Sequence, residues 1–328
     1  MTEPTDTRLF AAAPDGTRLP VIDITNPAFE ASWTDAEIDE MIAKALRDEE
    51  ARGPVQRLFI GLMLRLLARN SRLIGALRAA DDTYLGGIST YVLKLGPTNL
   101  VPPYDSEIDR QLVKAPLVAS MRLRLSEMAT LAAEGLASEL RARPGAPLHL
   151  LEIAGGPSAD ALNALILLNR EGLLAGRRVR ISIYDIDANG PAFAANMLAA
   201  LKMGPLGGCD IEMAHVTGSW AETGKLRDLL ADVPADAIVA AMSEGGLFEY
   251  GSDAEIAGVL GVLAPRVGIV VGSVTRNDRL NQLIRRHSRA VTVPRGLERF
   301  AGLIAPSGYR IARSRPSPLS DQVLLTRS

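Results

Sequence analysis

The chain of 328 residues is long enough for one large domain or two of ordinary size. Hydrophobic residues make up 47% and charged residues 23%, which fits a globular protein and excludes a disordered one. The formal net charge of −2 gives no reason to expect binding to nucleic acid or to an anionic membrane. The single cysteine, Cys209, excludes an intrachain disulfide and a Cys-rich zinc site, and the three histidines have no metal-ligand spacing.

The N-terminal sequence MTEPTDTRLF has no basic segment followed by an apolar one, so no export signal is visible and we expect a cytoplasmic protein. Residues 55–68 form the most apolar helical segment. This segment is too short to span a bilayer and contains Arg57 and Arg65, so we expect a core or interface helix and no membrane partner.

The first 145 residues are predicted to be mainly helical after a polar leader. Thr34 and Glu37 have the spacing of a capping box, which predicts a helix that ends near residue 52. A loop is expected over residues 96–104, which contain three prolines and a glycine, and a break near Pro116. Further helices are expected over about residues 71–80, 81–95 and 106–143.

From Leu148 onward, short apolar runs alternate with helical stretches, which is typical of βαβ units. Only residues 315–321 separate the last two predicted strands, too few for a crossover helix, so this pair should be antiparallel. The sequence predicts an α/β fold with a mostly parallel seven-stranded sheet over residues 146–328, preceded by a helical region over residues 1–145. The expected strands are 148–153, 179–184, 211–216, 236–242, 267–274, 309–314 and 322–327, with helices near 158–174, 189–202, 222–231 and 253–263.

A glycine-containing turn, Ala154-Gly155-Gly156-Pro157, follows the first of these strands, and the next helix starts near Ser158. Such a turn lets the backbone approach a ligand, and the helix start offers free N–H groups. Asp185 ends the second strand, where a carboxylate can accept hydrogen bonds from two ribose hydroxyls. The pattern favours an adenosine-bearing ligand. In the alternative, the glycines only permit tight packing and Asp185 caps a helix.

These residues resemble the first motif and the ribose-binding acid of the Rossmann-like, class I S-adenosylmethionine-dependent methyltransferases. Ala154 and Ser158 replace two motif glycines, and Gly156 keeps the middle one. The resemblance covers roughly residues 120–328 and implies S-adenosyl-L-methionine as cofactor, with Glu152 on its amine side and Ser219 and Trp220 near its adenine. The cofactor-binding residues that it implies are Glu152, Ala154, Gly155, Gly156, Pro157, Asp185, Ile186, Ser219, Trp220, Met242 and Ser243.

The acceptor side is predicted from two segments. After the fourth strand, Glu244 could take a proton from an acceptor hydroxyl or amine, and Glu249 and Tyr250 could form a wall. Methyl transfer mainly needs alignment and exclusion of water, so such a base is optional. In the N-terminal region Tyr84 and Tyr91 lie two helical turns apart and could bind substrate. In the alternatives, residues 246–250 form an ordinary loop packed on the sheet, and the tyrosines dock their helix.

The segment from Arg276 onward holds eleven arginines and three acidic residues, a net charge of +8. It could face an anionic substrate, an acyl carrier protein or RNA. Because aromatic residues are not interleaved with the arginines, we expect no nucleic acid. A solvated face, or pairing with an acidic region of a second subunit in a homodimer, is the preferred interpretation.

The predicted function is methyl transfer to oxygen or nitrogen of a small-molecule acceptor, for example in secondary metabolism. Three alternatives stay open: an enzyme that uses the same cofactor for aminocarboxypropyl transfer or cyclisation, an NAD(P)-dependent oxidoreductase, and a binding or scaffold protein. The oxidoreductase is considered because residues 154–159 also fit a degenerate G-x-G-x-x-A fingerprint.

Overall fold

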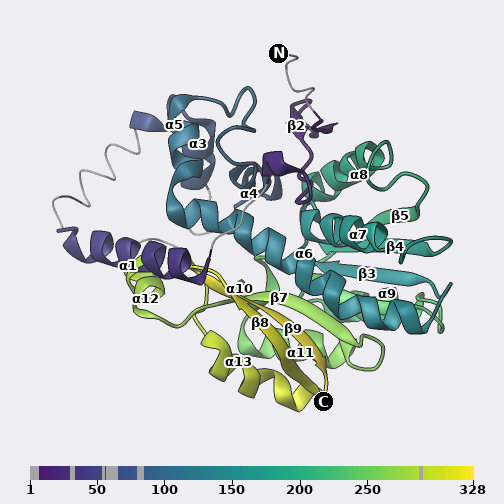
Figure 1. Ribbon diagram of the computed structural model, residues 1–328. Helices are drawn as coiled ribbons and strands as arrows, with labels where there is room; N and C mark the ends of the chain where they lie inside the picture. Colours follow the sequence, from purple (N-terminus) through teal and green to yellow (C-terminus); the bar gives the residue numbers. More distant parts are fainter. Residues whose placement is uncertain (1–6, 30–33, 54–55, 57–65, 80–84, 288–290) are drawn as a thin grey trace.

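The computed structural model describes residues 7–29, 34–53, 56, 66–79, 85–287 and 291–328 (Figure 1). A seven-stranded sheet has the strand order β5-β4-β3-β6-β7-β9-β8. Neighbouring strands are parallel from β5 to β7, and β9 pairs antiparallel with both β7 and β8, as the short gap between the last two strands predicts. The strands are β3 (Leu148–Ile153), β4 (Arg178–Asp185), β5 (Asp210–Thr217), β6 (Ile238–Ser243), β7 (Ile269–Thr275), β8 (Tyr309–Pro316) and β9 (Ser320–Arg327).

This order is that of the class I methyltransferase fold, with the last strand inserted into the sheet as an antiparallel neighbour. The predicted strands agree with the observed ones within two residues at each end. The order in which strands join the sheet reverses at β3. β4 and β5 extend the sheet on one side of β3, and β6, its parallel neighbour, lies on the other side. In open α/β sheets, the crevice at the carboxyl ends of two such strands is where ligands bind.

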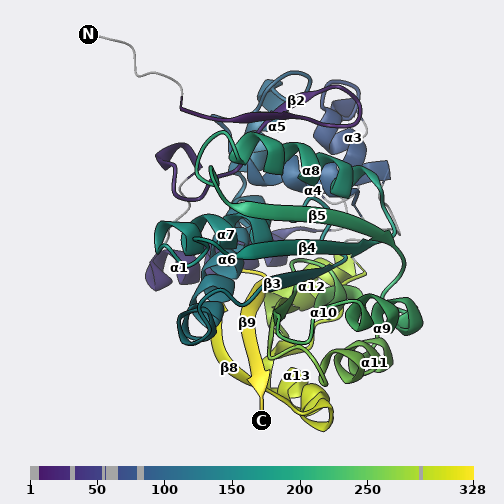
Figure 2. The ribbon, with the colours of Figure 1, turned by 90° about the vertical axis from the view of Figure 1, so that its right-hand side faces the viewer.

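Helices cover both faces of the sheet (Figure 2). β3, β6 and β7 are buried along their whole length, which explains their continuous apolar sequences. The helix predicted to end at residue 174 already ends at Arg170, because Gly172 adopts a left-handed φ of +73°. One face carries α6 (Pro116–Ala142), α7 (Ala159–Arg170) and α8 (Asn189–Leu201). The other carries α9 (Thr223–Ala231), α10 (Leu247–Tyr250), α11 (Asp253–Leu263), α13 (Gly296–Ile304) and a 3-10 helix (Ala305–Ser307).

The N-terminal region contains the predicted capping box at Thr34 and Glu37 and the predicted break at Pro116. The glycine pair Gly86-Gly87 lies at the start of a helix, not within one as the sequence suggested. The segment 55–68 lies mostly outside the described residues. The helices here are α1 (Asp35–Ala51), α3 (Arg72–Ala79), α4 (Gly87–Lys94), α5 (Glu107–Lys114) and a 3-10 helix (Pro27–Phe29); α12 (Arg279–His287) packs against α1.

The polar leader is in part a β-hairpin of β1 (Phe10–Ala12) and β2 (Arg18–Pro20), which the sequence analysis missed. Its turn contains Asp15-Gly16, a pair typical of tight hairpins. The chain after the hairpin is fastened to α7, because Asn163 accepts a hydrogen bond from Ile24 N–H and donates one to the Ile22 carbonyl.

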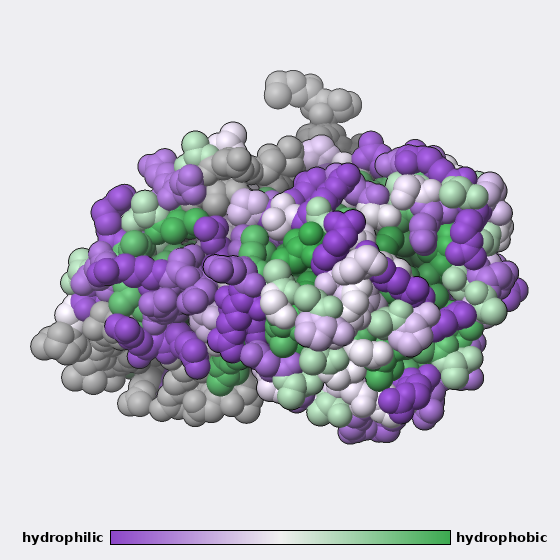
Figure 3. Space-filling view, turned by 90° about the horizontal axis from the view of Figure 1, so that it is seen from below, coloured by the Kyte–Doolittle hydropathy of each residue, from purple (hydrophilic) through white to green (hydrophobic). Residues whose placement is uncertain are grey.

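The N-terminal region shares its core with the sheet. One cluster of buried side chains joins Leu19 of β2, Tyr91 of α4 and Leu125 of α6 with β3 and β4. The division of the chain near residue 145 stays a prediction, and α6, which precedes that point, packs on β7 and β9. Hydrophilic residues cover much of the face seen from below (Figure 3). Within the described ranges, no helix has the length and apolar composition needed to cross a bilayer.

Candidate active site

A cavity of about 510 Å³ lies at the carboxyl ends of β3, β4 and β6, a volume typical of small-molecule sites. α4, α6 and α12 complete its walls. Among the predicted cofactor-binding residues, those that line it are Ala154, Gly155, Gly156, Pro157, Asp185, Ile186 and Trp220. The lining also includes four predicted acceptor-side residues, Glu244, Glu249, Tyr250 and Tyr91. It does not include the predicted residues Glu152, Ser219, Met242 and Ser243. Tyr84 lies outside the described residues.

The turn after β3 has the backbone of a glycine-rich motif although two of the glycines are replaced. Ala154, Gly156 and Ser158 have φ angles of +53°, +49° and +50°. A left-handed backbone is unfavourable for residues with a Cβ atom and recurs at ligand-binding sites. A Cβ atom on Gly190, at the start of α8, would lie 2.7 Å from the carbonyl carbon of Gly156, so this packing requires glycine. The left-handed turn is therefore packed directly against the start of α8.

Asp185 is joined to this turn. Its Oδ2 accepts a hydrogen bond from Gly156 N–H and its Oδ1 accepts one from Asp187 N–H, both over 2.8 Å. Each carboxylate oxygen retains a lone pair for a ligand hydroxyl. Asp185 does not cap the following helix, because the residue at that position is Ala188 and no side chain caps it. The contacts therefore favour ligand binding over the capping alternative.

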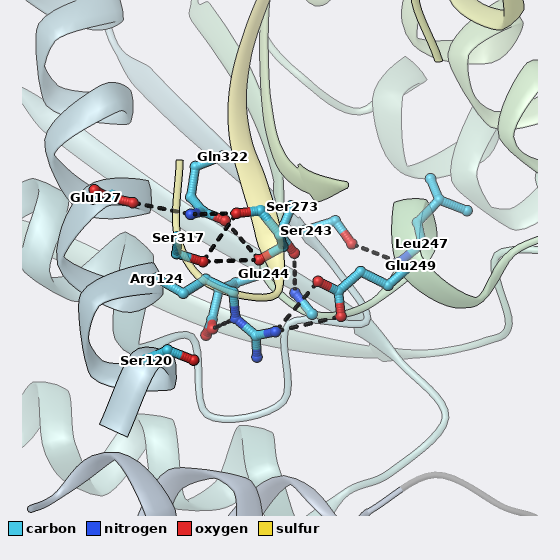
Figure 4. Close-up of polar contacts among 12 residues, drawn as sticks. Ser120, Arg124, Glu127, Ser243, Glu244, Leu247, Glu249, Ser273, Ser317 and Gln322 are labelled. Atoms are coloured by element: carbon cyan, nitrogen blue, oxygen red, sulfur yellow. Dashed lines mark hydrogen bonds and ion pairs between the residues drawn. The ribbon is translucent and has the colours of Figure 1, made fainter. Parts of the chain in front are cut away.

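Two cations that the sequence analysis missed enter the cavity from the N-terminal helices. Lys94 of α4 is bonded to Glu244, and Arg124 of α6 contacts Glu244 Oε1 through Nε at 2.7 Å. Arg124 Nη1 also lies 3.3 Å from both carboxylate oxygens of Glu249. Figure 4 shows the Arg124 guanidinium between these two carboxylates. Lys94 and Glu249 are buried, and the side chains of Arg124 and Glu244 are only 12% and 6% exposed, so the ion pairs are little screened by solvent.

The two glutamates differ in their ionisation. Burial raises the pKa of Glu244, but Lys94 and Arg124 outweigh burial, and the pKa lies below its ordinary value. Burial also raises the pKa of Glu249, and there Arg124, the Ser273 hydrogen bond and Lys94 do not reverse the shift. A carboxylate with a lowered pKa and two cationic partners is a poor proton acceptor. Glu244 is thus held by two cations, and the assignment of a glutamate as the proton acceptor stays a prediction.

Two buried carboxyl groups lie beneath the turn. Glu152 is 0% exposed, and neither of its carboxylate oxygens has a hydrogen-bond partner among the described residues. Asp160 lies in the first turn of α7, and its Oδ2 is likewise buried without a hydrogen-bond partner among the described residues. Burial raises the pKa of Glu152 well above its ordinary value and the pKa of Asp160 to about 7. A Cβ atom at Gly155 would overlap the Glu152 carboxylate. Lys94 acts on both groups, but the two Glu152 oxygens and Asp160 Oδ2 still have no hydrogen-bond donor among the described residues, and a bound ligand can supply one.

Tyr91 docks its helix, which was the alternative interpretation. Its hydroxyl accepts a hydrogen bond from Ile22 N–H and donates one to the Pro20 carbonyl, each over 2.8 Å, and its ring packs edge-on against Phe193. The hydroxyl is thus fully used within the protein, which argues against a direct role in substrate binding.

The remaining predicted residues form the supports and walls of the site. Ser243 Oγ donates to the Ile153 carbonyl and accepts from Leu247 N–H, which fixes the loop that carries Glu244. The Ser219 carbonyl accepts from the Tyr184 hydroxyl and so places the neighbouring Trp220 at the cavity. The apolar side chains that line the cavity include Leu85, Met121, Tyr250 and Ile284, which we call the apolar wall. Within the part of the chain that the structure describes, no cluster of side chains could hold a metal ion.

The strand order and the site at the carboxyl ends define the Rossmann-like fold of the class I methyltransferases. No family model matches the sequence, and no curated protein matches it. Solved structures that are similar include the magnesium protoporphyrin IX methyltransferase of Synechocystis PCC 6803 with bound S-adenosylhomocysteine, at 14% identity and a TM-score of 0.44 over 65% of this chain and 87% of that chain. An O-methyltransferase family protein from Burkholderia thailandensis is 16% identical, with a TM-score of 0.42 over 68% and 60% of the two chains. Human N-acetylserotonin methyltransferase is 16% identical, with a TM-score of 0.36 over 65% and 59%. The fold assignment rests on the strand order of this chain.

Proposed function

We propose that the protein transfers a methyl group from S-adenosyl-L-methionine to a small-molecule acceptor. The observation that carries the proposal is a set of buried carboxyl oxygens without hydrogen-bond partners, both of Glu152 and Oδ2 of Asp160, beneath a left-handed turn that is hydrogen-bonded to Asp185. Four carboxyl groups line the cavity, those of Asp185, Asp187, Glu244 and Glu249, and two more, Glu152 and Asp160, lie beneath the turn, against the two cations Lys94 and Arg124. This excess of acidic groups suits a ligand that carries a sulfonium and an ammonium group.

The residues present fit the cofactor. Asp185 would accept hydrogen bonds from the ribose hydroxyls, Glu152 would receive the ammonium group, and Lys94 and Arg124 would attract the carboxylate. When bound, the cofactor supplies a methyl group on a positively charged sulfur atom. The protein then has to align the acceptor atom with that methyl group and exclude water.

The acceptor would lie against the apolar wall of Leu85, Met121, Tyr250 and Ile284. Because these four side chains carry no charge, the apolar wall favours a neutral and largely apolar molecule. Glu249 would accept the proton that an acceptor hydroxyl or amine loses, since its pKa is raised and it lines the cavity. Glu244 would hold Lys94 and Arg124 in place.

Thermal unfolding in the presence of S-adenosylhomocysteine, S-adenosylmethionine and NAD(P)H, each tested separately, checks the proposal. A ligand at a hundredfold excess over its Kd stabilises the native protein by ~2.7 kcal/mol. We expect stabilisation by the first two compounds only. Stabilisation by NAD(P)H alone would favour the oxidoreductase alternative, and no stabilisation by any of them would favour a scaffold protein.

A further inference from the structure

A second hollow, of about 550 Å³, lies at the amino ends of the parallel strands, whereas the candidate active site lies at their carboxyl ends. Its walls are the C-terminal half of α6, the starts of β6 and β7, and parts of β8 and β9. The two cavities are therefore separated by the length of the parallel strands. The proposed methyl transfer therefore does not use this hollow.

Three arginines of the hollow are held by backbone carbonyls. Arg143 donates to the Asp236 carbonyl, and Arg266 Nη2 donates to the carbonyls of Val233 and Pro234, over 3.2 and 2.7 Å. Arg327 Nε donates to the Val267 carbonyl over 3.3 Å. These contacts fix the side chains but do not neutralise them, because a carbonyl group carries no net charge. Each guanidinium has five N–H donors, so most of them remain available.

The hollow is positively charged. Among the described residues, Arg143, Arg266 and Arg327 form no ion pair. A fourth arginine, Arg313, is paired with Glu134, and Glu139 is the other carboxylate in the lining. Four arginines against two glutamates give a formal charge of +2.

We propose that this hollow binds a phosphate-bearing small molecule through Arg143, Arg266 and Arg327. Guanidinium groups match phosphate oxygens with pairs of parallel hydrogen bonds, and side chains that are already fixed lose little entropy on binding. The volume exceeds that needed by inorganic phosphate and is typical of sites for larger molecules, so a ligand with two or more phosphates fits best. The site also gives a function to part of the basic C-terminal segment, since Arg313 and Arg327 belong to it.

Calorimetric titration with pyrophosphate tests this site, with inorganic phosphate and adenosine triphosphate as further probes and sodium chloride at matched ionic strength as the blank. Pyrophosphate lacks adenosine and so should not bind the cofactor site. We expect pyrophosphate to bind more tightly than phosphate, and the double variant Arg143→Gln/Arg327→Gln to weaken its binding at least tenfold. Arg310→Gln is the matched control, because Arg310 is exposed on the same strand as Arg313 but does not line the hollow. It should change the affinity less than twofold.

The double variant Arg143→Lys/Arg327→Lys keeps the charge and loses the paired donors, so its affinity should lie between those of the wild type and the glutamine variant. Affinity for S-adenosylhomocysteine should be equal in all variants, which separates a failure here from a failure of the proposed function. The proposal is overturned if pyrophosphate does not bind at millimolar concentration, or if Arg310→Gln weakens binding as much as the double variant. Tighter binding of an RNA oligonucleotide that pyrophosphate does not displace would also overturn it.

Discussion

Gly156 donates its backbone N–H to Oδ2 of Asp185 over 2.8 Å, and this bond joins the turn after β3 to the end of β4. The two predicted parts of the cofactor site are thus one hydrogen-bonded unit. A change at Asp185 should therefore affect both ligand binding and the local stability of the turn.

Replacing Asp185 by alanine should weaken S-adenosylhomocysteine binding by about 1–3 kcal/mol, because a buried ribose hydroxyl loses its acceptor. Chemical denaturation should show a loss of stability as well, since Gly156 N–H is left without a partner. Calorimetric titration measures the first effect. Asp210→Ala, at an exposed ion pair with Arg178, is the control and should change neither quantity appreciably. If the Asp185→Ala variant bound S-adenosylhomocysteine as tightly as the wild type, the proposed contact between Asp185 and the ribose would be refuted.

Replacing Glu244 by glutamine should lower the free energy of unfolding by about 3–5 kcal/mol, because Lys94 and Arg124 would remain buried without their shared partner. Glu171→Gln removes an exposed ion pair with Arg141 and should cost no more than about 1 kcal/mol. Urea denaturation of both variants checks the comparison. Equal small losses would show that the buried ion pairs do not hold the site together.

Affinity for S-adenosylmethionine should increase as the pH rises from about 5 to 8. Glu152 and Asp160 have pKa values above those of the unfolded chain, so they lose protons late in the folded protein and lower its stability as the pH rises through that range. A nearby cation lowers these pKa values, so binding should release protons. Calorimetry in buffers of different ionisation enthalpy measures the release. Glu152→Gln should reduce it, and no release in the wild type would contradict the placement of the ammonium group.

His149 should limit stability in acid. Burial, with Arg180 adding to it, lowers the pKa of His149 to about 4, while the unfolded chain takes up the proton near pH 6.5. The folded pKa is the lower one, so its contribution is present above pH 6.5 and is lost as the pH falls toward 4, by roughly 3 kcal/mol in total. His149→Gln can keep a hydrogen bond to Ser182 and does not titrate. Thermal unfolding across this range should therefore be less pH-dependent in the variant.

Tyr91→Phe should lower stability by about 1–3 kcal/mol, because Ile22 N–H and the Pro20 carbonyl lose a buried partner. Cofactor affinity and turnover of the folded protein should change little. Denaturation, calorimetry and a methyl-transfer assay together measure the three quantities. A loss of turnover without a change in stability or cofactor affinity would instead support a role of Tyr91 in binding the acceptor.

The sequence was sufficient for the sheet because strands and crossover helices are encoded in short local patterns. Even the antiparallel pairing of β8 and β9 follows from the length of one gap. Lys94 and Arg124 were missed because their partner, Glu244, lies 150 and 120 residues away, and nothing near either cation marks it. Asp160 was missed for a related reason: an acid in the first turn of a helix is ordinary, and only its burial distinguishes it.

The residues that follow the N-terminal hairpin make the sheet domain dependent on the start of the chain. Pro20 and Ile22 hold the Tyr91 hydroxyl, and Ile22 and Ile24 hold the Asn163 side chain, so this short segment fastens α4 to α7. A chain that began after residue 24 would leave the Tyr91 hydroxyl, at the wall of the cavity, and Asn163 Oδ1 without these partners, while Asn163 Nδ2 would keep its bond to the Ala159 carbonyl. Proteolytic trimming at this end would therefore loosen α4, whose Tyr91 lines the cavity, although the removed residues do not line it themselves.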